Sequence, residues 1–317
     1  MLNIEHIKAS YERIQSHIRK TGLKKSSLFE DVELYLKLEN EQFTNSFKLR
    51  GVMSKLTSMD TDALTEGVMT VSSGNHGAAV SYASKLLGIN NANIIVPACT
   101  PQSKMDNIKK YGANVLIMGQ TYDEAHDLGE QYQKENNLTY IDAYYEDLQV
   151  YAGQGTLGLE ILEQAQDIDI LLVPVGGGGL ITGIATAVKA ISPHVKVIGM
   201  QTSACPAMIH AMRDNTFYET YPSQPNICDA LVGGIGKRAF EMMYDSIDDI
   251  IEVEESNILS ATRKLYKVDG VIAEPSSALF VSAIENNLSK FVGKKVAAVI
   301  SGGNIDKTIL TKIKEEI

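Results

Sequence analysis

The stretch DILLVPVGGGGLITGIATAVKAI, residues 169–191, decides the fold. It opens with an almost wholly apolar run, which is typical of a β-strand inside a sheet. Four glycines follow, Gly176, Gly177, Gly178 and Gly179, and apolar residues then recur at helical spacing. The stretch therefore predicts a strand, a tight glycine turn and a helix in direct succession.

The same strand-then-helix pattern recurs on both sides of this stretch. The strand and helix pairs are residues 32–40 with 47–56, 68–73 with 74–88, 93–97 with 101–112, 114–119 with 121–137, 195–200 with 203–212, and 294–303 with a final helix at about 306–316. Ile4, Ile7, Ile14 and Ile18 indicate an amphipathic helix before them. Such alternation predicts an α/β protein with mostly parallel sheets covered by helices.

The length of the chain predicts more than one core. Its 317 residues exceed what one compact core usually supports, so we expect two domains with a ligand cleft between them. We place the small domain at residues 67–141 and form the large one from residues 1–66 and 142–317. Residues 213–236 lack periodicity and carry Pro and Gly, so we expect a long irregular connection near a site.

Composition narrows the class of protein. The net charge is -10 and no basic stripe is present, which argues against a nucleic-acid partner. Cys99, Cys205 and Cys228 show no CxxC spacing, so we expect neither disulfides nor a metal site. Polar residues interrupt every apolar run near the N-terminus, so we expect no secretory or membrane segment and place the protein in the cytoplasm.

The glycine run, residues 176–179, is a candidate phosphate site. Backbone N–H groups and the positive end of the following helix together form a cradle for an anion. The alternative is a tight turn that needs a positive φ. The run is not a P-loop, and without a GxGxxG pattern and an acidic ribose partner a nicotinamide cofactor is disfavoured.

Lys48 is a candidate nucleophile. It lies in NSFKLRG, where a strand pattern changes to a helical one, and it is flanked by Phe47 and Leu49. A half-buried amine has a lowered pKa and can attack an aldehyde. The alternative is an ordinary lysine at a helix start whose charged end reaches the solvent.

Two further joints predict polar side chains at the same sheet edge. SSGNHG, residues 72–77, follows one strand and could bind a carboxylate, or its serines could simply cap a helix. SGGN, residues 301–304, follows the last apolar strand. Together with the glycine run, these joints provide what a phosphorylated, ring-containing ligand and a carboxylate need.

Six motifs now carry a resemblance. NSFKLRG, SSGNHG, AGQGT, VPVGGGG, AEPSSA and SGGN, in this order, resemble the serine/threonine dehydratase and serine racemase family of fold-type II pyridoxal-phosphate enzymes. The resemblance covers nearly the whole chain. It implies a two-domain, tryptophan synthase β-like fold, pyridoxal 5'-phosphate as cofactor and a homodimer.

The resemblance also implies roles for individual residues. Lys48 would hold the cofactor as a Schiff base and later remove the α-proton, with Phe47 beside the ring. Asn75 would bind the 3'-oxygen of the ring, Ser301 would face the pyridine nitrogen, and Gly176, Gly177, Gly178 and Gly179 would hold the phosphate. The residues implied for the substrate carboxylate are Ser72, Ser73, Asn75 and His76. Ser73 also aligns with the serine that acts opposite the lysine in the racemases.

The implied activity is α,β-elimination from a small hydroxy amino acid, giving a 2-oxo acid and ammonia. L-Threonine, L-serine and 3-hydroxyaspartate are the candidate substrates. The first alternative is a serine or aspartate racemase that uses the same site, and the second is an inactive amino-acid-binding protein. Ser301 is neutral and does not stabilise a protonated pyridine ring, which favours elimination over a long-lived carbanion.

Several positions depart from the family pattern. Residues 18–40, IRKTGLKKSSLFEDVELYLKLEN, lack the usual Thr-Pro before their leucines, and residues 140–147, YIDAYYED, stand where His-Pro-Phe-Asp is common. Gln201 stands at or near the glutamate that binds a cation in many relatives, so we expect no cation. Ala230 replaces a glycine facing the substrate. The chain ends soon after SGGN, so we expect no C-terminal regulatory domain.

Overall fold

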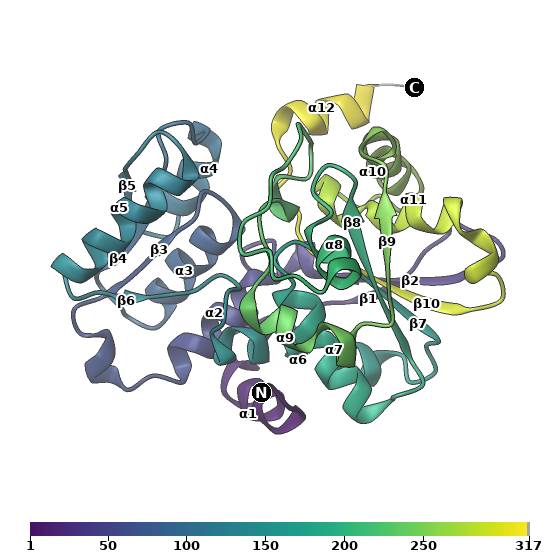
Figure 1. Ribbon diagram of the computed structural model, residues 1–317, viewed down its shortest axis with the longest axis horizontal. Helices are drawn as coiled ribbons and strands as arrows, with labels where there is room; N and C mark the ends of the chain where they lie inside the picture. Colours follow the sequence, from purple (N-terminus) through teal and green to yellow (C-terminus); the bar gives the residue numbers. More distant parts are fainter. Residues whose placement is uncertain (316–317) are drawn as a thin grey trace.

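The computed structural model describes residues 1–315, whose strands form two separate sheets (Figure 1). The larger sheet contains, in spatial order, β1 (Leu23–Lys25), β2 (Glu33–Leu38), β10 (Lys295–Ile300), β7 (Ile170–Pro174), β8 (Lys196–Thr202) and β9 (Asp249–Val253). The smaller sheet contains β5 (Asn114–Ile117), β4 (Ala92–Val96), β3 (Val68–Val71) and β6 (Thr139–Tyr140). Among the strands of residues 1–315, only β1 runs antiparallel to its neighbour.

Helices cover both sheets. The α-helices are α1 (Ile4–Ile14), α2 (Lys48–Thr57), α3 (Asn75–Leu86), α4 (Gln102–Lys109), α5 (Tyr122–Glu135), α6 (Leu148–Gln164), α7 (Gly179–Ile191), α8 (Ala207–Asp214), α9 (Lys237–Ser246), α10 (Glu255–Asp269), α11 (Leu279–Asn286) and α12 (Lys307–Glu315). The short 3₁₀ turns are η1 (Glu39–Glu41), η2 (Thr61–Leu64), η3 (Asp229–Leu231), η4 (Pro275–Ser277) and η5 (Leu288–Lys290). No helix within residues 1–315 is both long and apolar enough to cross a membrane.

The larger sheet is buried on both faces, which explains why its central strands are apolar without alternation. In β7, Leu171 and Val173 join the core formed with α6 and α7. Ile170 and Leu172 point the other way, into the core formed with α10 and α11. The continuous apolar run of β7 therefore contributes side chains to two hydrophobic cores, one on each face of the sheet.

The smaller sheet is layered in the same way. Ile94 lies in the core shared with α2 and α3, whereas the next residue, Ile95, lies in the core under α5. Parallel strands end at one edge of a sheet, so the loops after β3 and β4 emerge on the same side. The strands of this sheet fall inside the range predicted for the small domain, and the domain boundaries themselves stay a prediction.

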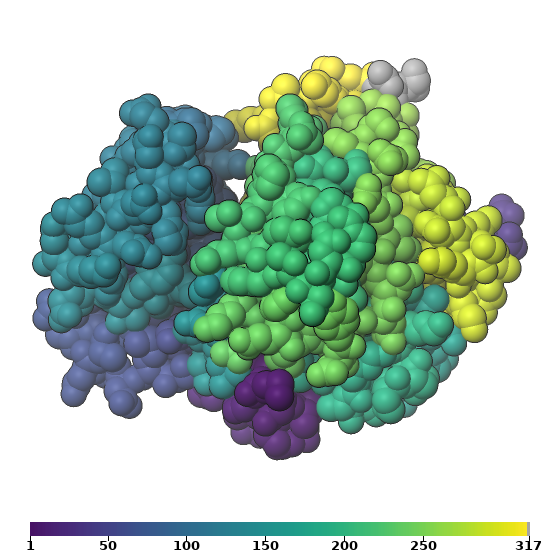
Figure 2. Space-filling model, viewed as in Figure 1, coloured from purple at the N-terminus to yellow at the C-terminus, as the bar shows by residue number. Residues whose placement is uncertain are grey.

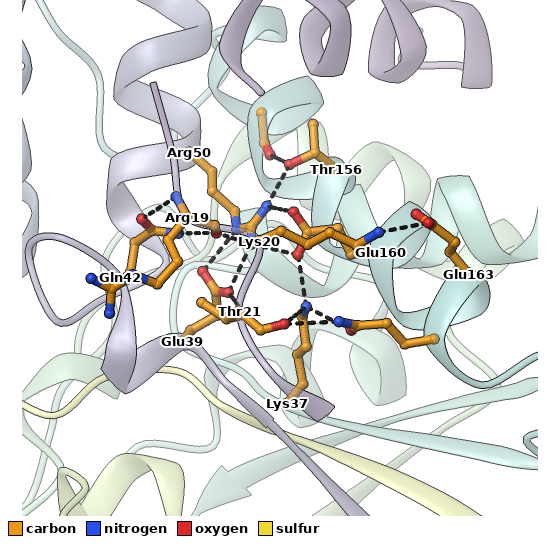
Figure 3. Close-up of polar contacts among 12 residues, drawn as sticks. Arg19, Lys20, Thr21, Lys37, Glu39, Gln42, Arg50, Thr156, Glu160 and Glu163 are labelled. Carbon is orange, nitrogen blue, oxygen red and sulfur yellow. Dashed lines mark hydrogen bonds and ion pairs between the residues drawn. The ribbon is translucent and has the colours of Figure 1, made fainter. Parts of the chain in front are cut away.

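A buried ionic cluster joins β2, η1 and α2 to α6 (Figure 3). The guanidinium of Arg50, in α2, donates to both carboxylate oxygens of Glu39 at 2.7 and 2.8 Å and to both of Glu160 at 2.8 and 2.9 Å. The Lys37 amine, in β2, donates to Glu160, to the Thr21 carbonyl and to Gln164. Two positive and two negative side chains thus balance inside the protein.

The predicted α/β class with mostly parallel, helix-covered sheets is confirmed. The helices and strands from residue 237 to 286, namely α9, β9, α10 and α11, were not marked in the sequence, and neither was α6. The final helix, predicted at about 306–316, begins at Lys307, and residue 316 lies outside the described residues. Residues 213–236 are irregular apart from the end of α8 and the turn η3, as predicted.

Candidate active site

A cavity of about 540 Å³ lies where the two sheet units meet. In Figure 2 the blue part of the surface, which carries the smaller sheet, is separated from the green and yellow parts by a notch. Every site residue predicted from the sequence lines this cavity: Phe47, Lys48, Ser72, Ser73, Asn75, His76, Gly176, Gly177, Gly178, Gly179 and Ser301. Motifs from both ends of the chain therefore meet at one place.

Lys48 is the first residue of α2, and its amine faces the cavity. The amine lies 3.3 Å from the Ala143 carbonyl oxygen and between the rings of Phe47 and Tyr144, whose centroids are 5.3 and 5.8 Å away. Burial lowers the pKa of the amine to about 8, although the Asp142 carboxylate acts in the opposite direction. A substantial neutral fraction near pH 8 makes Lys48 suited to attack a carbonyl carbon.

The glycine run forms the turn between β7 and α7. Gly178 has a φ of +87°, and a Cβ there would lie 2.6 Å from Ala239. A Cβ on Gly177 would lie 2.1 Å from the Tyr144 ring. The turn therefore needs glycine for its own geometry, and it also directs N–H groups at the start of α7 toward the cavity.

The loop after β3 leads into α3, whose first residue is Asn75. The N–H groups of the first turn have no partner inside a helix and form a binding place for an anion. His76 donates through Nε2 to the Ile141 carbonyl at 3.0 Å, and burial together with Lys48 lowers the pKa of this histidine to about 4. The His76 ring is therefore neutral, and its backbone N–H is the group able to donate to a carboxylate.

Asn75 is held by two residues that received no role from the sequence. Its amide nitrogen donates to both oxygens of Glu274 at 2.8 and 3.1 Å, and its oxygen accepts from Asn304 at 2.6 Å. Glu274 is only 6% exposed, and burial raises the pKa of its carboxyl group. Glu274 lies in the AEPSSA motif and Asn304 in the SGGN motif. Their place in these motifs was the sequence signal that could have identified them as site residues.

Ser301 directly follows β10 and lines the cavity. Its hydroxyl lies 3.1 Å from the Ser277 hydroxyl, which also accepts from the Gly302 N–H at 3.0 Å. No carboxylate is hydrogen-bonded to Ser301 among residues 1–315. The group offered at this point of the cavity is a neutral hydroxyl.

Gln201 is occupied by a structural task. Its side-chain oxygen accepts the Met208 and Ile209 N–H groups at 3.0 Å each, which caps the start of α8. Within residues 1–315 no group of three or more His, Cys, Asp or Glu side chains is arranged to hold a metal ion.

Comparison with known proteins supplies the family. The model of the family described as "Pyridoxal-phosphate dependent enzyme" matches residues 14–302. An L-threonine ammonia-lyase from Thermotoga maritima is 38% identical over 317 residues, covering 99% of this chain and 78% of that protein. The structure of maize serine racemase matches with a TM-score of 0.91 at 30% identity, covering 98% and 96% of the two chains. Threonine deaminase isoform 2 from Solanum lycopersicum matches with a TM-score of 0.90 at 31% identity, covering 98% and 86%.

The fold and the cavity define an α/β enzyme with a ligand cavity between two sheets. The chain belongs to the pyridoxal-phosphate dependent enzyme family. The residues present fit that cofactor: a glycine turn that side chains would fill, an amine with a lowered pKa, and a neutral hydroxyl that lines the same cavity.

Proposed function

We propose that the protein is a pyridoxal-phosphate dependent ammonia-lyase that converts a small hydroxy amino acid to a 2-oxo acid and ammonia. The substrates that we propose are L-threonine, L-serine and 3-hydroxyaspartate. One observation carries the proposal: the Lys48 amine, the first turn of α3 and the glycine turn line the same cavity. The amine can then bind the cofactor, and the two helix starts can bind the cofactor phosphate and the substrate carboxylate in the same cavity.

Each residue has a distinct task in this proposal. Gly176, Gly177, Gly178 and Gly179 hold the cofactor phosphate, Phe47 supports one face of the ring, and Ser301 offers its hydroxyl to the ring nitrogen. Asn75 lines the cavity, and its amide nitrogen would turn one N–H from Glu274 to the 3'-oxygen. When bound, the cofactor supplies an aldehyde carbon and a ring that withdraws electrons from the substrate's α-carbon.

The substrate is held and deprotonated by the chain's own groups. The N–H groups at the start of α3, with the hydroxyls of Ser72 and Ser73, bind the carboxylate. Lys48 takes the α-proton, since its lowered pKa lets the amine act as a base near neutral pH. Because Ser301 is uncharged, the negative charge that develops at the α-carbon is not strongly stabilised, and departure of the β-hydroxyl relieves it.

The test measures two products in parallel. Protein supplied with pyridoxal 5'-phosphate is incubated with L-serine, D-serine, L-threonine and the 3-hydroxyaspartates, and 2-oxo acid and chiral inversion are recorded. We expect 2-oxo acid from at least one L-substrate and none from Lys48→Ala. Inversion without 2-oxo acid, or silence on every substrate despite bound cofactor, would contradict the lyase.

A racemase is the second candidate, and one observation favours it. Ser73 lines the cavity, and its hydroxyl shares a 2.9 Å hydrogen bond with Thr100. A hydroxyl there could protonate the α-carbon from the face opposite Lys48. A Ser73→Ala variant that loses inversion but keeps 2-oxo acid formation would assign a racemase side activity to this serine.

Assembly and location are part of the same proposal. We propose a homodimer, the commonest symmetric state of soluble enzymes, which light scattering would report as twice 34.6 kDa. We also propose a cytoplasmic location and two domains, with residues 67–141 as the small one. A monomer mass at working concentration would contradict the dimer.

A further inference from the structure

Residues 142–147, which lie in the segment 140–147 that departs from the family pattern, are folded around one carboxylate. Asp142 Oδ1 accepts the N–H groups of Tyr144 at 2.9 Å and Tyr145 at 2.8 Å. Asp142 Oδ2 accepts those of Glu146 at 2.8 Å and Asp147 at 3.0 Å. Four successive backbone donors on one side chain make this turn rigid, and each bond to a charged acceptor is stronger than a neutral one.

This turn touches the proposed active site from one wall. Its Ala143 carbonyl oxygen accepts a hydrogen bond from the Lys48 amine at 3.3 Å. The Ile141 carbonyl accepts from both His76 Nε2 at 3.0 Å and the Thr70 hydroxyl at 2.9 Å. The turn thus positions groups of α2 and α3 relative to each other.

The far side of the turn is anchored to the glycine run and its neighbours. The Tyr144 ring occupies the space beside Gly177, where a Cβ would come within 2.1 Å of it. The Tyr144 carbonyl accepts the Tyr151 hydroxyl at 2.5 Å, and Arg238 donates to the Glu146 carbonyl at 2.6 Å. A shift of the turn would therefore move the wall of the phosphate site as well as the Lys48 partner.

The charge of Asp142 acts on Lys48. Burial raises the pKa of Asp142, but its four backbone donors outweigh burial and hold this pKa below the usual value, so the carboxylate is ionised. The ionised carboxylate raises the pKa of Lys48 against the lowering by burial. Two further groups near Lys48 are the neutral His76 ring from α3 and the Tyr144 phenol, whose pKa burial raises.

We propose that Asp142 is a positioning residue for Lys48: its carboxylate folds residues 142–147 into the turn that holds the Lys48 amine and supports the glycine run. The role rests on the proposed function only in that Lys48 is taken as the cofactor lysine. The placement of the amine is a property of the chain and is measurable without turnover.

The test uses the full chain with Asp142→Asn, which preserves shape. The asparagine oxygen can still accept two of the N–H groups, but its NH₂ faces the other two donors and the charge is gone. Two readouts are independent of turnover: the pH dependence of Lys48 acylation in cofactor-free protein, followed by peptide mass spectrometry, and hydrogen exchange of the amides of residues 144–147. Asp147→Asn is the matched control, since the Asp147 side chain caps α6 and pairs with Lys55 but contacts neither Asp142 nor Lys48, and the backbone N–H that donates to Asp142 is kept.

We expect half-maximal acylation near pH 8 in the unchanged chain and at lower pH in Asp142→Asn. Exchange of the amides of residues 144–147 should be at least about fivefold faster, because two hydrogen bonds are lost. In the loaded enzyme kcat should fall with little change in the KM for substrate. Asp147→Asn should leave the acylation profile unchanged.

A second variant separates charge from geometry and serves if Asp142→Asn does not fold. Asp142→Glu keeps the charge on a longer arm, so kcat should fall and the amides of residues 144–147 should exchange faster. Unchanged acylation and exchange in Asp142→Asn, or an equal shift of acylation in Asp147→Asn, would overturn the proposal. An inactive enzyme with the expected acylation shift would overturn the proposed function and leave this inference standing.

Discussion

At the scale of single residues, two opposing effects meet on the Lys48 amine. Burial disfavours its charged form and the Asp142 carboxylate favours it, and burial wins, since the pKa falls to about 8. The same environment keeps the His76 ring uncharged. The cavity thus places an amine that is readily deprotonated beside a histidine that does not compete for its proton.

The buried His76 makes the free energy of unfolding depend on pH. Its pKa is about 4 in the folded chain against an ordinary value of 6.5, so its contribution is present above pH 6.5 and is lost as the pH falls toward 4. From this shift we expect a loss of up to about 3 kcal/mol over that window. Urea titrations at several pH values would measure it.

The control for this prediction is a second histidine. His76→Asn should flatten the loss of stability between pH 6.5 and 4. The same change at His194, which is exposed, should leave the loss unchanged. Equal slopes in His76→Asn and the unchanged chain would show that other groups carry the pH dependence.

At the scale of elements, the glycine turn between β7 and α7 is predicted to tolerate no side chain. Gly178→Ala combines a positive φ with contacts of 2.6 Å to Ala239 and 2.7 Å to Met208. Gly88→Ala has a similar φ of +72° but open space around the new Cβ. We expect Gly88→Ala to cost about 1 kcal/mol and Gly178→Ala to cost about 1–3 kcal/mol more.

Chemical denaturation of both variants would test the glycine prediction, together with a titration of cofactor affinity. Gly178→Ala should also weaken binding of pyridoxal 5'-phosphate, because the turn is the proposed phosphate site. Gly88→Ala should bind it normally. Equal losses of stability in the two variants would mean that the turn relaxes around the extra methyl group.

The free energy of unfolding is predicted to depend on whether positive and negative side chains balance in the ionic cluster around Arg50. It should depend less on how many charges the cluster holds. Burial opposes the charged guanidinium, but Glu39 and Glu160 raise the pKa of Arg50, so it stays charged. Glu160→Leu leaves Lys37 and Arg50 sharing one carboxylate and should cost about 3–5 kcal/mol. The double change Lys37→Met with Glu160→Leu restores balance and should cost less.

Equilibrium unfolding of the single and double variants would check the cluster prediction. The comparison is direct because Lys37 and Glu160 are in contact at 2.7 Å and both are buried. A double variant less stable than Glu160→Leu would show that Lys37 stabilises the chain even without Glu160, and would contradict the prediction.

At the scale of the whole molecule, the cavity is lined from both sheet units, so a ligand in it ties them together. We expect pyridoxal 5'-phosphate to raise the midpoint of thermal unfolding, with about 2.7 kcal/mol of stabilisation at a hundredfold excess over Kd. Pyridoxal without the phosphate should stabilise less, since it does not engage the glycine turn. Differential scanning fluorimetry would compare the two, and equal shifts would argue against a phosphate site there.

Local sequence determined a large part of the architecture. Apolar runs, glycines at the joints and helical spacing marked most strands and helices correctly, because each signal acts within a few residues of its cause. The segments α6, α9, β9, α10 and α11 were not predicted. The motif residues of the site were placed by order and resemblance, and they line one cavity.

Only the tertiary structure decided how these residues work together. Asn75 meets Glu274 and Asn304 although they are 199 and 229 residues away in sequence, and Lys48 meets Ala143 across 95 residues. Burial of Lys48 and His76, and hence the direction of their pKa shifts, follows from the way two sheets pack around a cavity. Local pattern determines which elements form, whereas desolvation and charge pairing depend on neighbours that only packing brings within a few ångströms.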